Sequence, residues 1–196
     1  PVPNTNISLQ YAVLALLATM YGPVAGGLIG FIGHALIDLS WGGSPWWSWV
    51  ITSAFVGVVI GLFAKKLDVQ EGEFGKGKVA VFVVANVIAH VIGWVVVAPV
   101  LDILIYAEPA NKVFAQGVFA AVSNTVTGVI VGGLLVLSTR EFMRCIIQML
   151  LDSYQFCRMS GDCMHFILRS TTVFQSKCNI LTNRQSDKLS IRILKN

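Results

Sequence analysis

Charged residues are scarce in this chain, and the first 37 of its 196 residues contain no Lys, Arg, Asp or Glu. Only 12% of the residues are charged, 55% are hydrophobic, and the mean hydropathy is +0.73. A soluble domain carries roughly 25% charged residues, and a core of this size cannot bury so much apolar surface. The composition therefore excludes a soluble globular domain and predicts an all-α, multi-pass transmembrane helical bundle.

Catalytic and metal-binding signatures are also missing. The chain has no HExxH, GxSxG or GxGD motif and no phosphate-binding loop lysine. All four cysteines lie after residue 144 without a CxxC pair, and His34 and His90 have no clear third ligand. We therefore expect a protein that is not an enzyme, holds no metal or other cofactor, and binds no nucleic acid.

Five apolar segments are candidates for membrane spans. They are residues 7–21, 22–39, 46–64, 79–98 and 113–138. The first is short, about 22 Å at 1.5 Å per residue, and the fourth is expected to end before Pro99. Glycines repeat every four residues at Gly22, Gly26 and Gly30. This spacing favours close helix packing within one bundle, with a dimer or docking face as the alternative.

Basic residues indicate the orientation of these spans. Four lysines lie between residues 65 and 78, and Arg140 follows the fifth segment. The positive-inside rule places both regions in the cytoplasm and loops 40–45 and 99–112 outside.

The composition changes near residue 140. Residues 141–196 carry eight basic and four acidic residues, whereas residues 1–140 carry six of each. We predict a transmembrane domain at 1–140 and a cytoplasmic tail at 141–196. In this tail, we expect residues 141–156 to form an amphipathic helix on the membrane surface and the rest to be poorly ordered.

With this orientation, polar and aromatic residues gather at the outer ends of the spans. They are Asn4, Thr5 and Asn6 before the first, His34 and Asp38 in the second, Trp46, Trp47 and Trp49 in the third, Asn86, His90 and Trp94 in the fourth, and Asp102, Tyr106, Glu108 and Asn111 in the loop that follows it. Aromatic planes can stack on a flat ring while amides and histidines bind its polar edge. The pattern therefore predicts a pocket open to the exterior.

Each group also has a structural alternative. The tryptophans are typical of an interfacial belt, and Asn86 and Asn124 can bridge helices by hydrogen bonds. Asp102 and Glu108 can be solvated loop residues or helix caps. His34 and Asp38 can form a structural pair, although an ionisable pair within a span is by default a functional-site hypothesis.

Several long motifs resemble a known family. PNTNI, LQYAVLAL, GPVAGGLIGFIGHALIDLSWG, WWSWV and APVLDILIYAEPANKVFAQGV are similar to segments of the substrate-binding S components of bacterial energy-coupling factor (ECF) vitamin transporters, in particular the HmpT-like subgroup. The resemblance covers residues 1 to about 140. It implies a six-helix bundle in the bacterial cell membrane with a substrate site near the outer face. It also implies three partners: a transmembrane coupling subunit and two cytoplasmic ATPases.

This chain departs from that family at both ends. We expect it to lack the family's first helix, which leaves five of the six spans, and residues 141–196 do not resemble the family's short basic C-terminus.

We therefore predict a substrate-binding membrane subunit that captures a small vitamin or precursor for ATP-driven uptake. The ligand is pyridoxine-like, hydroxymethylpyrimidine-like or riboflavin-like. The predicted contacts are Asn6, His34, Asp38, Trp46, Trp47, Asn86, His90, Trp94 and Asn111. The tryptophans would stack on the ring, the histidines and asparagines would bind its substituents, and Asp38 would orient His34 or bind a hydroxyl. The alternatives are a structural membrane protein without a transport role and an intramembrane enzyme that uses His34 and Asp38 as acid and base.

Overall fold

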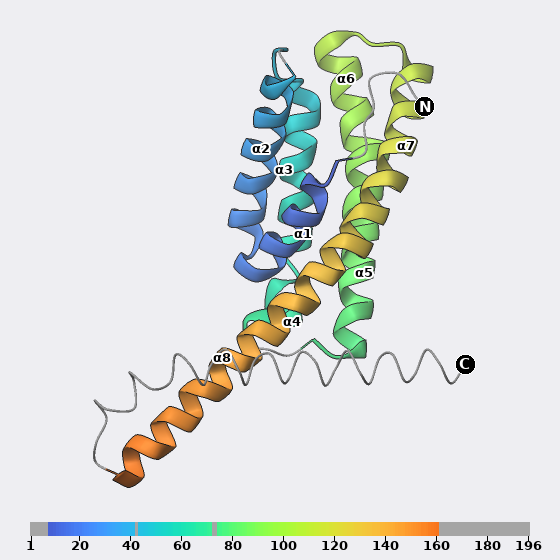
Figure 1. The fold of residues 1–196 in the computed structure, drawn as a ribbon. Coiled ribbons are helices and arrows are strands. Elements are labelled where there is room, and N and C mark those ends of the chain that lie inside the picture. The colour runs from blue at the N-terminus through green and yellow to red at the C-terminus, as the bar shows by residue number, and fades with distance from the viewer. Residues whose placement is uncertain (1–7, 42, 72–73, 161–196) are drawn as a thin grey trace, which may run out of the picture. The chain divides into compact units, whose positions relative to one another are not determined.

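The computed structural model describes residues 8–41, 43–71 and 74–160, and this part of the chain is helical without a strand (Figure 1). The helices are α1 Gln10–Tyr21, α2 Pro23–Ser40, α3 Trp47–Gly61, α4 Ala64–Leu67, α5 Lys76–Val91, α6 Ala98–Tyr106, α7 Ala110–Thr127 and α8 Gly133–Ser160. A 3-10 turn covers Val69–Glu71, and π-helical segments cover Ile92–Val97 and Gly128–Gly132.

Four helical stretches are long and apolar enough to cross a membrane. They are Pro23–Ser40, Trp47–Leu67, Lys76–Tyr106 and Ala110–Gln148, and Gln10–Tyr21 is a shorter apolar helix. The predicted all-α membrane bundle is therefore confirmed. Each of the five predicted apolar segments contains a helix, and the first of these is shorter than a span.

Internal contacts divide the chain into two units, Pro1–Ser138 and Thr139–Asn196. The helices that surround the site, α1 to α7, belong to the first unit. Helix α8 continues to Ser160 and so includes the predicted helix at 141–156. The prediction for the remainder of the tail falls outside the described residues.

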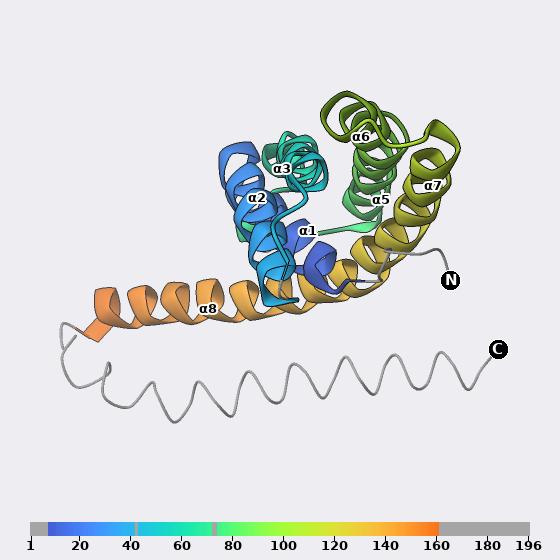
Figure 2. The same ribbon diagram turned by 90° about the horizontal axis from the view of Figure 1, so that it is seen from above.

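Close packing of α2 on α3 brings small residues of both helices together. A Cβ added at Gly26 would overlap the backbone of Gly57, and one added at Gly30 would overlap the backbone of Ser53. Figure 2 shows α1 between this helix pair and the pair formed by α5 and α7. The four-residue glycine spacing thus serves packing within the chain, as predicted.

Pro99 does not end the fourth span, contrary to the sequence-based expectation. Helix continues from Lys76 to Tyr106. A π-helical segment, Ile92–Val97, precedes the proline, and its wide turn is closed by a hydrogen bond from Ala98 N to Gly93 O. This widening accommodates the ring of Pro99, which would otherwise clash with the backbone carbonyl four residues earlier. As a result, Asp102 lies on a helix and is buried, so the alternative of a solvated loop carboxylate is wrong for this residue.

The turns between α2 and α3 and between α6 and α7 lie at the same end of the first unit, whereas α4 lies at the opposite end (Figure 1). Helix α4 carries Lys65 and Lys66. The residues that border these two turns, among them Asp38, Trp46 and Glu108, therefore lie at the end of the bundle remote from these lysines.

Candidate functional site

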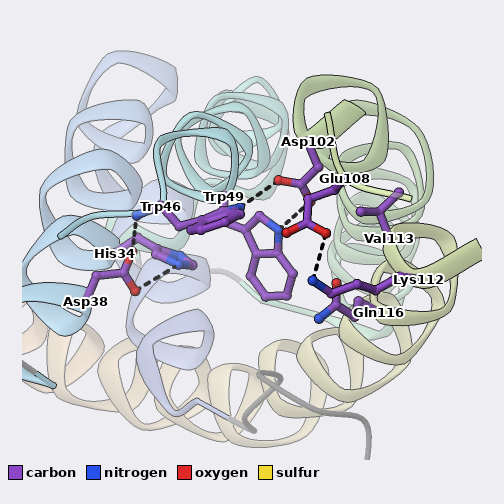
Figure 3. Close-up of a pocket in the computed structure, with 9 residues that line it drawn as sticks. All are labelled: His34, Asp38, Trp46, Trp49, Asp102, Glu108, Lys112, Val113 and Gln116. Carbon is purple, nitrogen blue, oxygen red and sulfur yellow. Dashed lines mark hydrogen bonds and ion pairs between the residues drawn. The ribbon is translucent and has the colours of Figure 1, made fainter. Parts of the chain in front are cut away.

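A cavity of about 230 Å³ lies at the end of the bundle where α2 turns into α3 and α6 turns into α7. It is lined by His34, Asp38, Trp46, Trp49, Asp102, Glu108, Lys112, Val113 and Gln116 (Figure 3). Figure 3 shows His34 and Asp38 on one side, Glu108, Lys112 and Gln116 on the other, and the two tryptophans between them. The cavity thus assembles side chains that are up to 82 positions apart in the sequence (116 − 34).

Asp102 holds the tryptophans in place. Its carboxylate is only 3% exposed and accepts hydrogen bonds from Trp46 Nε1 at 2.7 Å, Trp49 Nε1 at 2.9 Å and the hydroxyl of Ser48. A buried carboxylate is stable only when its oxygens are satisfied. These donors belong to the N-cap and first turn of α3, where the helix dipole also favours a negative charge.

Two backbone donors at the start of α3 are capped by residues distant in sequence. Trp46 N donates to Asp38 Oδ2 at 2.8 Å, and Trp47 N donates to the Tyr106 hydroxyl at 3.1 Å. The Trp46 ring stacks on Tyr106 with centroids 4.1 Å apart. Because the first N–H groups of a helix have no partner within it, these bonds fix where α3 begins and how Trp46 is oriented.

His34 connects the cavity to the interior. Its Nδ1 lies 2.6 Å from Ser53 Oγ and 3.1 Å from the Tyr11 hydroxyl, and these two hydroxyls are 2.9 Å apart. On the cavity side, His34 Nε2 lies 3.7 Å from Asp38 Oδ1. The predicted His34–Asp38 pair therefore exists, with Asp38 nearer the cavity mouth and His34 anchored below it.

The opposite wall carries the charge pair of Glu108 and Lys112, with Nζ 2.7 Å from Oε2. Gln116 lies one turn further along α7 and is buried. Three carboxylates and one ammonium group thus line the cavity. Within the described ranges, no cluster of three His, Cys, Asp or Glu side chains is arranged to hold a metal ion.

A second layer lies beneath the cavity. Trp94 is fully buried, with its ring 5.1 Å from that of Trp49 and 5.7 Å from that of Tyr11. It donates through Nε1 to His90 Nδ1 at 3.3 Å. His90 and Asn86 are fully buried on the same face of α5, and none of these three residues lines the cavity.

The predicted contact residues are thus distributed unevenly. His34, Asp38 and Trp46 line the cavity, whereas Trp47 is 47% exposed and packs its ring 6.1 Å from Phe31. Asn111 is exposed on α7, outside the lining. Asn6 lies outside the described residues.

Five polar or aromatic lining residues were not among the predicted contacts: Trp49, Asp102, Glu108, Lys112 and Gln116. For Asp102 the sequence does contain a signal, because it is a lone carboxylate in the apolar run APVLDILIY. The reasoning that singled out His34 and Asp38 applies equally to it.

Comparison with known protein families identifies the family of this chain. The family model described as "ECF-type riboflavin transporter, S component" matches residues 1–141. The chain belongs to this S component family. S components are subunits of membrane transporters and are not enzymes, so the chain is a multi-pass cell membrane protein of a vitamin-transport family. All nine residues that line the cavity lie within the matched region.

Similar proteins come from several bacteria. A UPF0397 protein of Streptococcus agalactiae is 56% identical over 137 residues, which are 70% of this S component and 75% of the relative. A UPF0397 protein of Exiguobacterium sp. is 54% identical with the same coverage. One of Lacticaseibacillus casei is 46% identical over 70% of this chain and 74% of the relative. No solved structure matches this chain.

Proposed function

We infer that this S component binds a small, single-ring vitamin or vitamin precursor in the cavity beside Trp46 and Trp49, for ATP-driven uptake by partner subunits. The observation that carries this proposal is the cavity itself, because it combines two aromatic walls with carboxylates, an ammonium group and an amide. Such a combination of apolar planes and a few placed polar groups is typical of small-molecule sites.

The size of the cavity favours a single ring. Its volume is about 230 Å³, whereas pockets for drug-sized ligands have volumes of about 300–1,000 Å³. A pyridoxine-like or hydroxymethylpyrimidine-like molecule suits the smaller space. A riboflavin-like ligand, which the family description favours, has three fused rings and a polyol chain and would require the cavity to widen.

The hydrogen bonds around the cavity indicate how a ring would be held. The indole N–H groups of Trp46 and Trp49 are both engaged by Asp102, so the tryptophans offer their faces rather than their polar edges. Among the described residues, the Asp38 carboxylate accepts one hydrogen bond, from Trp46 N through Oδ2, and its Oδ1 faces His34 Nε2 at 3.7 Å. A ligand hydroxyl or amino group would therefore donate to Asp38. Trp47, Asn111 and Asn6 remain candidates for contacts at the rim.

Membership of the family supports the partners and the orientation that we propose. We assign a transmembrane coupling subunit and two cytoplasmic ATPases as partners, with residues 65–78 and 140–196 in the cytoplasm. The four lysines between residues 65 and 78 support the cytoplasmic position of that segment. The cavity, at the opposite end of the bundle from α4, would then open to the cell exterior.

Titration of the purified chain with three compounds tests the proposal. Pyridoxine, hydroxymethylpyrimidine and riboflavin are compared by equilibrium dialysis, with tryptophan fluorescence as a second readout for the first two. We expect saturable binding of a single-ring compound at micromolar concentration. Asp38→Asn should weaken it about tenfold, the equivalent of one charge-assisted hydrogen bond of about 1.4 kcal/mol.

Trp41→Phe is the matched control for the fluorescence. Trp41 is 75% exposed at the end of α2 and does not line the cavity, so its replacement should leave affinity unchanged. Binding of riboflavin alone would overturn the size argument. Binding of none of the three, together with failure to co-purify with ATPase subunits, would favour the structural alternative.

A further inference from the structure

Three buried polar atoms on α5 and α7 have no hydrogen-bond partner among the described residues. They are Asn86 Oδ1 and His90 Nε2 on α5 and Asn124 Oδ1 on α7. Asn86 and His90 are fully buried, and Asn124 is 3% exposed. Buried polar groups in native proteins are paired with protein or with ordered water, so each of these atoms requires a partner.

The hydrogen-bonding roles of His90 Nε2 and Asn86 Oδ1 can be assigned from their neighbours, and Asn124 Oδ1 is an amide oxygen that accepts. An indole N–H can only donate, so the bond from Trp94 Nε1 makes His90 Nδ1 an acceptor. A neutral His90 therefore carries its proton on Nε2, which is a donor. Asn86 Nδ2 donates to Phe82 O at 2.9 Å, which fixes Asn86 Oδ1 as an acceptor. With Asn124 Oδ1, the cluster presents one donor and two acceptors.

Gly128 keeps the space beside these atoms free of a side chain. A Cβ added there would lie 2.9 Å from Asn86 Oδ1 and 3.3 Å from His90 Nε2. Asn124 lies one helical turn before Gly128, on the same face of the helix. Gly128 also begins a π-helical segment, a local widening that is often found at functional positions.

We propose that a single water molecule binds among Asn86, His90 and Asn124. It accepts the hydrogen bond from His90 Nε2 and donates one hydrogen to each asparagine oxygen. A water molecule supplies this combination of one acceptor and two donors without adding any further group to be accommodated. A cation would be repelled by the His90 N–H, and an anion would face two carbonyl oxygens.

The bound water would also determine how Trp94 is held. By accepting a hydrogen bond from the His90 Nε2–H group, it keeps Nδ1 available to accept from Trp94, whose ring lies against Trp49 of the cavity. His90 would then be a positioning residue rather than a ligand contact. This last step rests on the proposed binding function, whereas the water site itself does not.

A structure at a resolution that shows ordered water tests the site directly. We expect one peak within hydrogen-bond distance of all three atoms. A direct hydrogen bond from His90 to either asparagine, or a site without a peak, would overturn the proposal.

A pair of glycine variants tests the site in solution. Gly128→Ala places a methyl group against two of the polar atoms and should lower the melting temperature by several degrees. Gly133→Ala is the matched control, because its Cβ would meet only Phe82 Cε1 at 3.6 Å, an ordinary contact. Equal melting temperatures for the two variants would contradict the proposal.

A double-mutant cycle and a spectroscopic readout separate the water from simple packing. If Asn86→Leu and Asn124→Leu disturb one shared water, their combined effect on melting temperature is smaller than the sum of the two. The indole N–H signal of Trp94 in ¹⁵N-tryptophan spectra should shift in Asn124→Leu. Additive effects with an unmoved Trp94 signal would show that no shared water links these residues. All of these measurements are made without a vitamin, so their results do not depend on whether the proposed transport function is correct.

Discussion

Replacing Asp102 by leucine should weaken ligand binding strongly and lower the stability of the chain substantially. The variant leaves three donors, Trp46 Nε1, Trp49 Nε1 and the Ser48 hydroxyl, without their acceptor. One unsatisfied buried donor costs about 1–3 kcal/mol. We therefore expect a loss of about 3 kcal/mol, or ~6–12 °C in melting temperature for a chain of this size.

Ligand affinity should fall as well, because Trp46 and Trp49 both lose the group that orients them. We expect at least a ~100-fold loss of ligand affinity, equivalent to about 2.7 kcal/mol. Asp102→Asn is the finer test. Its amide keeps one acceptor oxygen but turns an N–H toward one of the indole donors. The stability and the ligand affinity of this variant should therefore lie between those of the wild type and of Asp102→Leu.

Glu108→Gln is the matched control for stability. Glu108 also lines the cavity, but its partner Lys112 is only four residues away, and the Lys112 side chain is 43% exposed. Exposed pairs of this kind contribute about 0.3–0.5 kcal/mol, so this variant should melt within a degree or two of the wild type. If Asp102→Leu melts at that same temperature, the carboxylate does not anchor α3.

The sequence allowed the fold class and the end of the bundle that holds the site to be predicted. A chain without charge before Asp38 must place its first helices in lipid, and the lysine-rich turn separates one end of the bundle from the other. His34, Asp38 and Trp46 could be nominated because polar side chains in such segments are rarely there by chance. These arguments use only local sequence and length.

The role of Asp102 could not be obtained in this way. Proline usually ends a helix, so Pro99 suggested a loop, and a carboxylate in a loop is ordinarily solvated. The π-helical segment at Ile92–Val97 carries the helix past the proline and turns Asp102 toward α3. Whether a proline is absorbed by such a widening depends on packing against other helices, which single-sequence reasoning does not contain.

His90 illustrates a different limit. Its depth along α5 was predicted from the rise per residue, and it does lie on one face with Asn86 and Trp94. Depth does not indicate which inward-facing residues line an open space. That is decided by Trp94, which fills the position between His90 and the cavity residue Trp49.

Substitution of Gly57 by alanine should be among the most damaging single changes outside the site. The added Cβ would overlap the backbone of Gly26 and lie 3.0 Å from Leu14 Cδ1. A clash with backbone cannot be relieved by a rotamer change, so α3 must move away from α2. We expect a loss of about 3 kcal/mol or more, measured by thermal unfolding of the purified chain.

The same change should weaken ligand binding although Gly57 lies eight residues beyond Trp49, about 12 Å along the helix. Helix α3 carries Trp49 and Ser48, so moving it away from α2 separates them from His34 and Asp38, which lie on α2. Gly77→Ala is the control, since a Cβ there meets nothing within 4 Å. It should be neutral or stabilising by up to ~1 kcal/mol. Equal stability of the Gly57→Ala and Gly77→Ala chains would contradict the close approach of α2 and α3. That approach keeps Trp49 on α3 near His34 and Asp38 on α2.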